Sequence, residues 1–300
     1  MKRTKKALKT EPAKYPSAIL TGDWHIREDQ PICRTDDFWK AQWRKVDSIS
    51  DLQKKYDCPV LHAGDVFEHW KPSPYLLTKA IRHFPDQFWT VYGNHDLPQH
   101  SIEQSGKTGV ETLKAAEKLR VMEGCHWEQM PEHGSFPFFK RNVLVWHVMT
   151  YVGEQPWPGC TDLTAMEILD KYPQFDLIIT GHNHKTFSYV TGTPQKPRLL
   201  VNPGSLTRHK ADQEDHEPCV YLWYAETNTV KQVLLPFDQN VISREHLDVP
   251  QERKERMKAY IERMNLEWRA GLSFKDNLEI HFRENKTTKK VKGMIWTSME

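Results

Sequence analysis

The stretch Phe88-Trp-Thr-Val-Tyr-Gly-Asn-His-Asp96 joins a continuous apolar run to a cluster of polar side chains at a single glycine. An uninterrupted run of β-branched and aromatic residues is typical of a strand that is covered on both faces. Four other runs of this kind occur in the first 180 residues: Ser17–Thr21, Pro59–Ala63, Asn142–Trp146 and Asp176–Thr180. Buried strands that alternate with helices predict a mainly parallel, layered sheet.

Helical patterns lie between several of these strands. Residues 36–56 carry apolar side chains near one stripe, and residues 73–84 open with Ser73-Pro74, where the proline suits a first helical turn. A third helix is predicted over residues 161–172, with Thr161 or Asp162 as its cap and a proline directly after it.

After Gly181 the pattern changes to short strands separated by glycine, proline or asparagine. These strands are predicted at residues 187–190, 198–201, 218–225 and 230–235. The short turns indicate antiparallel pairing in this part of the chain. Two sheets packed face to face, with helices outside, would bury a core of suitable size, so we expect an α/β fold with two packed sheets.

The charge is divided unevenly along the chain. The 300 residues have a formal net charge of +2, with 38% hydrophobic and 27% charged residues, a composition that excludes wholesale disorder. Both ends are basic, and the body between them is acidic. We therefore predict a basic tail (residues 1–16), a main domain (residues 17–240) and a C-terminal appendage (residues 241–300). Within the appendage we expect an amphipathic helix over residues 250–270 and a weakly structured basic end.

The location follows from what the sequence lacks. No apolar run approaches 18 residues, and the basic N-terminal residues are not followed by an apolar region, so we predict no contact with a membrane and no signal peptide. Five scattered cysteines without a CxxC spacing indicate reduced thiols and a cytoplasmic protein.

Polar side chains directly follow all five strands of the first 180 residues. The endings are Gly22-Asp-Trp-His25, Gly64-Asp65, Gly93-Asn-His-Asp96, His147 and Gly181-His-Asn-His184. Open α/β sheets bind their ligands at the carboxyl ends of strands, so we expect these endings to converge. Four of them place glycine before the first polar residue, where it permits a close approach that a Cβ would forbid.

Seven of these side chains form a ligand set of nitrogen and oxygen without sulfur: Asp23, Asp65, Asn94, His25, His147, His182 and His184. Such a set suits Mn, Fe or Zn and is too rich in nitrogen for a dedicated Mg or Ca site. Seven ligands match two ions if one carboxylate bridges them, and Asp65, alone on its loop, is the natural bridge. Single histidines such as His62, His126 and His209 are instead expected to be structural or surface residues.

The order D-x-H, GD, GNHD, H, GHxH over residues 17–237 resembles the calcineurin-like metallophosphoesterase superfamily. The resemblance implies a four-layer αββα sandwich, here with a short C-terminal helical appendage, and two divalent ions. It assigns one ion to Asp23, His25, Asp65 and His184, and the other to Asp65, Asn94, His147 and His182. It also implies that His95 acts near the leaving-group oxygen and that Asp96 orients His95.

Three segments are similar to one branch of the superfamily, the SbcD-like nuclease subunits of DNA double-strand-break processing complexes. They are Gly64–Tyr75, Tyr92–Ser101 and Asn202-Pro-Gly-Ser205. Glu68 stands where some members have a second catalytic histidine and His69 follows it, so either could reach the site. This branch implies a manganese-dependent nuclease, with DNA ends or single strands, an SbcC-like ATPase and a second copy of the chain as partners.

Aromatic residues beside the predicted metal loops are candidates for stacking on unpaired bases. The candidates for substrate contact are Trp24, His69, Trp70, Tyr75 and Arg208. Packing within the loops is the alternative for the aromatic residues. Two other functions stay open: a small-molecule phosphodiesterase or phosphoprotein phosphatase with the same chemistry, and a non-catalytic scaffold, which would have no need of a complete ligand set.

Overall fold

The computed structural model describes residues 15–122, 126, 127, 129, 136–138, 140–245 and 274–298. The chain divides between Ser243 and Arg244 into two compact units. The helix predicted over residues 250–270 lies outside the described residues, as does all but the last two residues of the predicted basic tail. Within the described ranges, no helix has the length and apolar character needed to cross a bilayer.

The first sheet of the larger unit has six strands in the order β11-β10-β1-β2-β3-β4. Their bounds are β1 Ala18–Thr21, β2 Val60–His62, β3 Phe88–Thr90, β4 Arg120–Val121, β10 Cys219–Tyr224 and β11 Thr229–Leu234. Strands β1 to β4 run parallel, whereas β10 is antiparallel to both β1 and β11. Only β4, which has two residues, is missing from the sequence prediction.

The second sheet has five strands in the order β5-β6-β7-β9-β8. Their bounds are β5 Phe136–Phe138, β6 Arg141–Trp146, β7 Leu177–Thr180, β8 Phe187–Thr193 and β9 Lys196–Asn202. The antiparallel part expected after Gly181 does not form a layer of its own. Instead, it forms two hairpins, β8–β9 and β10–β11. The buried strand β9 pairs in parallel with β7, and β10 pairs with β1, so each hairpin extends a different sheet.

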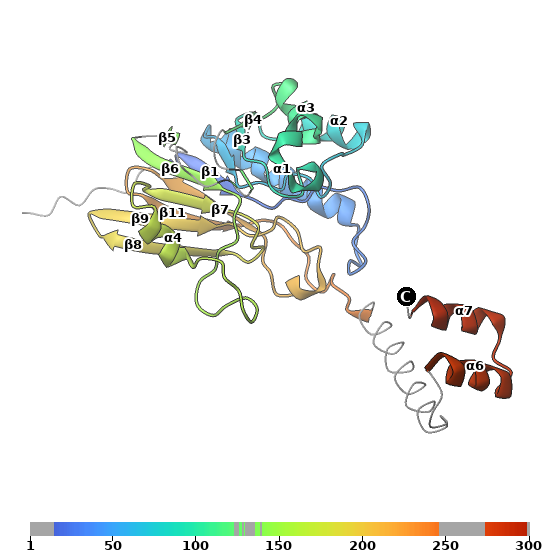
Figure 1. The fold of residues 1–300 in the computed structure, drawn as a ribbon. Helices are drawn as coiled ribbons and strands as arrows, with labels where there is room; N and C mark the ends of the chain where they lie inside the picture. The colour runs from blue at the N-terminus through green and yellow to red at the C-terminus, as the bar shows by residue number, and fades with distance from the viewer. Residues whose placement is uncertain are drawn as a thin grey trace, which may run out of the picture. The chain divides into compact units, whose positions relative to one another are not determined.

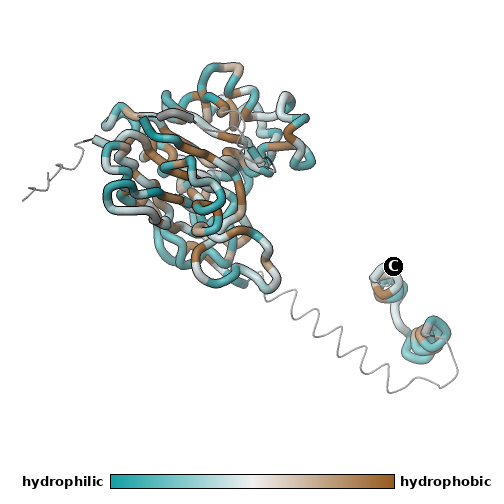
Figure 2. The backbone as a smooth tube through the Cα atoms, turned by 60° about the vertical axis from the view of Figure 1, so that its left-hand side comes forward, coloured by the Kyte–Doolittle hydropathy of each residue, from teal (hydrophilic) through white to brown (hydrophobic). Residues whose placement is uncertain are grey.

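Helices cover the outer face of each sheet (Figure 1). On the first sheet lie α1 (Phe38–Tyr56), α2 (Pro74–His83) and α3 (Gly109–Ala115), and on the second lies α4 (Ala165–Lys171). Because side chains alternate along a strand, Ile19 packs toward the helices while Ala18 and Leu20 pack against the second sheet. The predicted four-layer arrangement is confirmed. Figure 2 shows hydrophobic stretches alternating with hydrophilic ones along the backbone of the larger unit.

One predicted helix changes, and helix α3 is absent from the sequence prediction. Helix α4 begins later than expected because Thr164, and neither Thr161 nor Asp162, caps it in a reciprocal capping box with Glu167. Short 3₁₀ segments at Pro98–His100, Ile102–Lys107 and Ala211–Gln213 form turns of the connecting loops.

Of the smaller unit, the structure describes residues 244, 245 and 274–298, and the last of these ranges forms two short helices, α6 (Phe274–Glu284) and α7 (Lys289–Thr297). Leu278, Phe282 and Ile295 are buried against one another, and Trp296 packs beside them. The expectation of a weakly structured end is therefore wrong. The basic residues occupy the connection and the first turn of α7, and they leave the apolar stripe of each helix free to pack.

Candidate metal centre

The predicted ligand residues lie together at the carboxyl ends of β1, β2, β3, β6 and β7. His25 Nε2 is 3.1 Å from His184 Nε2 and 3.5 Å from Asp65 Oδ2. The same Asp65 oxygen is 3.3 Å from His147 Nε2, so it lies between two groups of imidazoles. Groups of His and acidic side chains that could hold a metal ion include Asp23–His25–Asp65 and Asp65–His147–His182.

The second group is completed by an amide. Asn94 Oδ1 is 3.0 Å from both His147 Nε2 and His182 Nδ1. On the other side, Asp23 accepts the backbone N–H of His182 at one carboxylate oxygen, while its second oxygen is buried without a hydrogen-bond partner. All seven side chains predicted as ligands thus share one pocket.

The hydrogen bonds around the imidazoles favour a cation in this pocket. His147 Nδ1 lies 2.7 Å from the carbonyl oxygen of Ala63, so this nitrogen carries the proton and donates it. The other nitrogen, Nε2, faces the oxygens of Asp65 and Asn94. A divalent cation bound between these atoms would replace the proton that Nε2 otherwise carries, because an imidazole nitrogen must be deprotonated to ligate a metal. The residues present therefore fit divalent ions.

The pKa values of the buried groups reflect this crowding of charge. Burial raises the pKa of Asp23 to about 6, with Asp65 adding to the rise and His147 opposing it. For Asp65 burial acts in the same direction, but His147 and His25 outweigh it and hold the pKa well below its usual range. In return Asp65 raises the pKa of His147 to about 9 against the effect of burial. Asp65 is therefore ionised, as a shared ligand must be.

The backbone is strained at four of the predicted ligands. Asp23, His25, Asp65 and His182 have φ values of 49°, 47°, 59° and 74°, in the left-handed region that non-glycine residues rarely adopt. Each costs on the order of 1–3 kcal/mol, and such residues gather at functional sites. At Gly64, which has φ 91°, an added Cβ would lie 2.6 Å from His147 Nδ1. The glycine before Asp65 therefore allows the two strand ends to meet, as the sequence predicts.

Glu68 contacts the metal cluster through His25. Its Oε2 is 3.0 Å from His25 Nδ1 and its Oε1 is 3.2 Å from Arg27 Nη1. Burial alone would raise its pKa, but His25 and Arg27 lower the pKa of Glu68 to about 2. A carboxylate on the far nitrogen of a ligating imidazole orients the ring and increases its basicity. Of the two alternatives at this position, Glu68 reaches the site, whereas His69 is exposed.

Replacing Glu68 with glutamine is expected to weaken metal binding more than the chemical step. The loss of charge beside His25 should lower the affinity for one ion by about 10- to 100-fold. Turnover at saturating metal should change by less than about tenfold, and equilibrium dialysis with steady-state kinetics separates the two effects. Asp29→Asn is the matched control, because Asp29 also pairs with Arg27 but is largely exposed. A large loss of turnover at saturating metal would instead mean that Glu68 acts on the substrate.

His95 is oriented by a backbone group. Its Nδ1 lies 2.9 Å from the Glu68 carbonyl oxygen, and its ring meets the His25 ring edge to face at 4.7 Å. The resemblance assigns the orienting role to Asp96, and the structure corrects this. The Asp96 carboxylate is fully buried and accepts the backbone N–H groups of Val66, Phe67 and Gly93. Asp96 therefore joins two metal loops to each other.

Two of the predicted substrate contacts are wrong in this structure. Trp24 is fully buried, packs against Phe84 and Phe88, and donates its indole N–H to Thr21, so neither ring face is available to a base. Arg208 is 4% exposed, and its guanidinium donates to the backbone carbonyls of Glu214 and Asp238. Both side chains make their contacts inside the protein and are therefore not available to a substrate.

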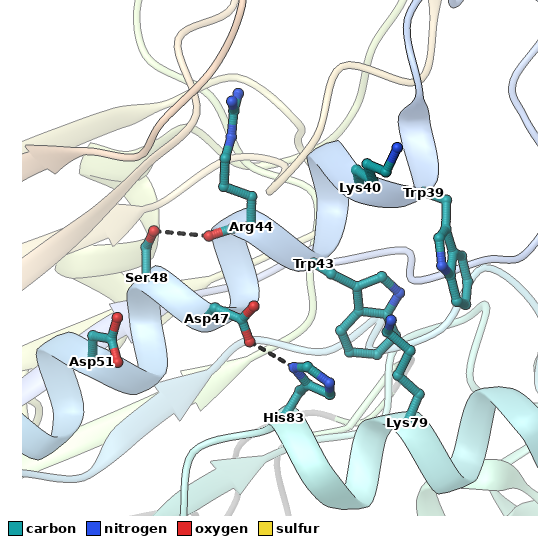
Figure 3. A pocket seen from close by; sticks show the side chains of 9 residues that line it. All are labelled: Trp39, Lys40, Trp43, Arg44, Asp47, Ser48, Asp51, Lys79 and His83. Carbon is teal, nitrogen blue, oxygen red and sulfur yellow. Dashed lines mark hydrogen bonds and ion pairs between the residues drawn. The ribbon is translucent and has the colours of Figure 1, made fainter.

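The remaining predicted contacts lie toward the surface. His69 is exposed and Trp70 is half-buried on the loop that follows Asp65. Tyr75 is 61% exposed and stacks on Trp39 with ring centres 5.7 Å apart. Trp39 lines a cavity of about 580 Å³ between α1 and α2, where Lys79 lies over its ring (Figure 3). None of the predicted metal ligands lines this cavity.

The structure also brings residues to the site that the sequence pattern did not select. Trp127 packs on His182 with ring centres 4.6 Å apart, and His209 packs on His25 and His184. A larger cavity of about 760 Å³ borders His184, and Trp157 lines it. Trp127, Trp157 and His209 follow none of the five strands that end in ligands, so a search for strand ends could not find them.

The fold and the site together define a metal-dependent phosphoesterase, in which two packed sheets converge on His, Asp and Asn side chains. Residues 19–226 match the model of the calcineurin-like phosphoesterase superfamily domain. The chain belongs to this superfamily. The comparison with curated proteins gave no match.

Three solved structures are similar to the chain, and each similarity covers 73% of it. A metallophosphoesterase from Sphaerobacter thermophilus has 14% identity over 88% of its length, with a TM-score of 0.40. A predicted phosphoesterase from Streptococcus pneumoniae has 13% identity over 97%, with a TM-score of 0.34. Vps29 from Entamoeba histolytica, complexed with Zn²⁺, has 14% identity over 99%, with a TM-score of 0.32.

Proposed function

We propose that this protein is a manganese-dependent DNA nuclease of the SbcD-like type, located in the cytoplasm and acting on DNA ends or single strands. One observation carries the proposal. The two longer segments that resemble the SbcD-like branch meet at the metal cluster, where the Glu68 carbonyl contacts His95 and the Glu68 carboxylate contacts His25. The two segments that carry the resemblance to this branch therefore both contribute residues to the metal cluster, which supports the proposal.

Different residues of the chain would bind the metal ions and transfer the proton in phosphodiester hydrolysis. When bound, a pair of divalent ions lowers the pKa of water and neutralises the phosphoryl oxygens. Asp23, His25, Asp65 and His184 would hold one ion, and Asp65, Asn94, His147 and His182 the other. His95, with Nδ1 directed at the Glu68 carbonyl, has Nε2 available to accept a proton from water and pass it to the leaving oxygen.

The cavity beside His184 supports a substrate larger than a single nucleotide. Its volume of about 760 Å³ is lined by Lys185 and Lys210, which can contact phosphates, and by Trp157, which is 48% exposed. The carboxylates of Asp212, Asp215 and Glu217 also line it. An exposed indole offers a face on which an unpaired base can stack, a contact worth about 1–3 kcal/mol. Trp157 thus takes the role that the sequence suggested for Trp24.

The test compares substrates under several metals. The metal-loaded chain is incubated with labelled single-stranded, blunt duplex and hairpin DNA, with cyclic nucleotides, with phosphopeptides and with bis-p-nitrophenyl phosphate. Cleavage of DNA that is fastest with Mn²⁺ is expected. Hydrolysis of bis-p-nitrophenyl phosphate without cleavage of any DNA would favour a small-molecule phosphodiesterase or a phosphatase, and metal binding without any hydrolysis would favour a scaffold.

A matched pair of variants checks the substrate class. Trp157→Ala should lower kcat/KM for single-stranded DNA by about 5- to 100-fold, the equivalent of one stacking contact, and should affect bis-p-nitrophenyl phosphate much less. Val152→Ala is the control, because Val152 is a similarly exposed apolar residue of the same loop. An SbcC-like ATPase and a second copy of the chain remain proposed partners, to be tested by co-purification and by sedimentation.

A further inference from the structure

His209 is a buried histidine that neither the strand-end pattern nor the family resemblance includes among the ligands. It is 7% exposed. Its ring centre lies 4.9 Å from that of His25 and 5.1 Å from that of His184. One ring nitrogen from each of the three histidines lies within 4.8 Å of the other two.

The loop that carries His209 is attached to two predicted ligands. The backbone N–H of Ser205 donates to the carbonyl of His184, and that of Leu206 donates to the carbonyl of Asp23. The buried side chain of Gln213 then accepts the backbone N–H of His209 at 2.8 Å and donates to the Ser205 hydroxyl at 2.7 Å. The position of His209 is therefore set by the same backbone that sets the cluster.

The His209 ring is not satisfied by the protein around it. Its Nδ1 is buried without a hydrogen-bond partner. A buried polar atom of this kind costs about 1–3 kcal/mol, and an apolar side chain would fill the same space without that cost. A cation shared with His25 and His184 removes the cost, because a neutral imidazole nitrogen is a metal ligand.

We propose that His209 is a fifth imidazole ligand of the metal centre, at the position held by Asp23, His25, Asp65 and His184. This position then offers three imidazoles, against two at the position that contains Asn94. Imidazole suits Zn²⁺ and Fe²⁺ better than Mn²⁺, so the two positions differ in the metal they select. The proposal rests on the metal centre and is independent of the substrate.

The direct test counts imidazole ligands in the wild-type protein. The full chain, labelled with ¹⁵N-histidine and loaded with ¹¹³Cd²⁺ as a stand-in for Zn²⁺, should show cadmium–nitrogen couplings from five histidines. His209→Gln should abolish one of these couplings and leave four. Four couplings in the wild-type protein, with no change in the variant, would overturn the proposal.

Metal affinity provides a second readout that does not depend on turnover. His209→Gln should lower the Zn²⁺ affinity of one of two positions by at least about tenfold, and its Mn²⁺ affinity by less. His83→Gln is the control, because His83 lies on α2 and pairs with Asp47. Circular dichroism of both metal-free variants checks that they fold. If His209→Gln does not fold, the number of cadmium–nitrogen couplings in the wild-type protein still tests the proposal. Unchanged Zn²⁺ affinity would show that His209 only packs against the ligands.

Discussion

Replacing Asp65 with asparagine is expected to lower hydrolysis of bis-p-nitrophenyl phosphate by at least about 10³-fold, the equivalent of about 4 kcal/mol of transition-state stabilisation. The reason is the position of Asp65, whose Oδ2 lies 3.5 Å from one imidazole group and 3.3 Å from the other. Removal of its charge should leave at most one ion per chain, which elemental analysis after dialysis measures.

The asparagine variant removes the negative charge of residue 65 and keeps the shape of its side chain. The amide has nearly the size of the carboxylate, and its oxygen can still accept the backbone N–H of His95, as Asp65 Oδ1 does at 2.9 Å. Asp170→Asn is the control, since Asp170 is an exposed carboxylate of α4 that belongs neither to the metal groups nor to the cavity beside His184. If the Asp65 variant retains two ions and stays within tenfold of wild-type turnover, the shared-ligand assignment fails.

His95→Gln is expected to lower kcat by about 10²- to 10⁴-fold at saturating metal without changing the number of bound ions. Burial lowers the pKa of His95, with Asp65 opposing the shift, so Nε2 is available to accept a proton from water and pass it to the leaving oxygen. Glutamine keeps a hydrogen-bonding side chain of similar length but does not transfer protons. Steady-state kinetics and metal analysis on one preparation measure both quantities.

The His95 variant also separates an enzyme from a scaffold. His69→Gln is the matched control, because His69 is exposed on the neighbouring loop and should keep turnover within about threefold of wild type. A scaffold would show no turnover to lose and would bind its partners equally well with either histidine replaced. If loss of metal accompanies loss of activity in His95→Gln, then His95 supports the ligands and does not take part in proton transfer.

Much of the fold could be predicted from local patterns. Continuous apolar runs predicted five of the strands, since a strand buried on both faces must be apolar throughout. Turn residues between short strands predicted four more, and β4 and β5 were not predicted. The two-residue strand β4 is too short for any periodicity to be visible. The helices α6 and α7 were missed because they are short, with 11 and 9 residues, and the basic residues between them obscure the few apolar positions that pack.

The candidate ligands could be predicted because each follows a buried strand directly. Asp65 comes after β2 and His147 after β6, and parallel strands bring such endings to one edge of a sheet. The corrections arise where the function of a side chain depends on what packs around it. Trp24 and Asp96 sit within the metal motifs, yet Trp24 faces the core and the Asp96 carboxylate is used by backbone N–H groups.

The sequence by itself determined the class of fold, the order of the strands that carry ligands, and a nitrogen and oxygen ligand set that requires a cation. These features depend on residues close together in the chain. Only the tertiary structure decided that Glu68 supports His25, that β10 joins the first sheet, and that His209 lies against the ligands. Those contacts join residues far apart in the chain, and hydrophobic patterning carries no information about which loop packs against which.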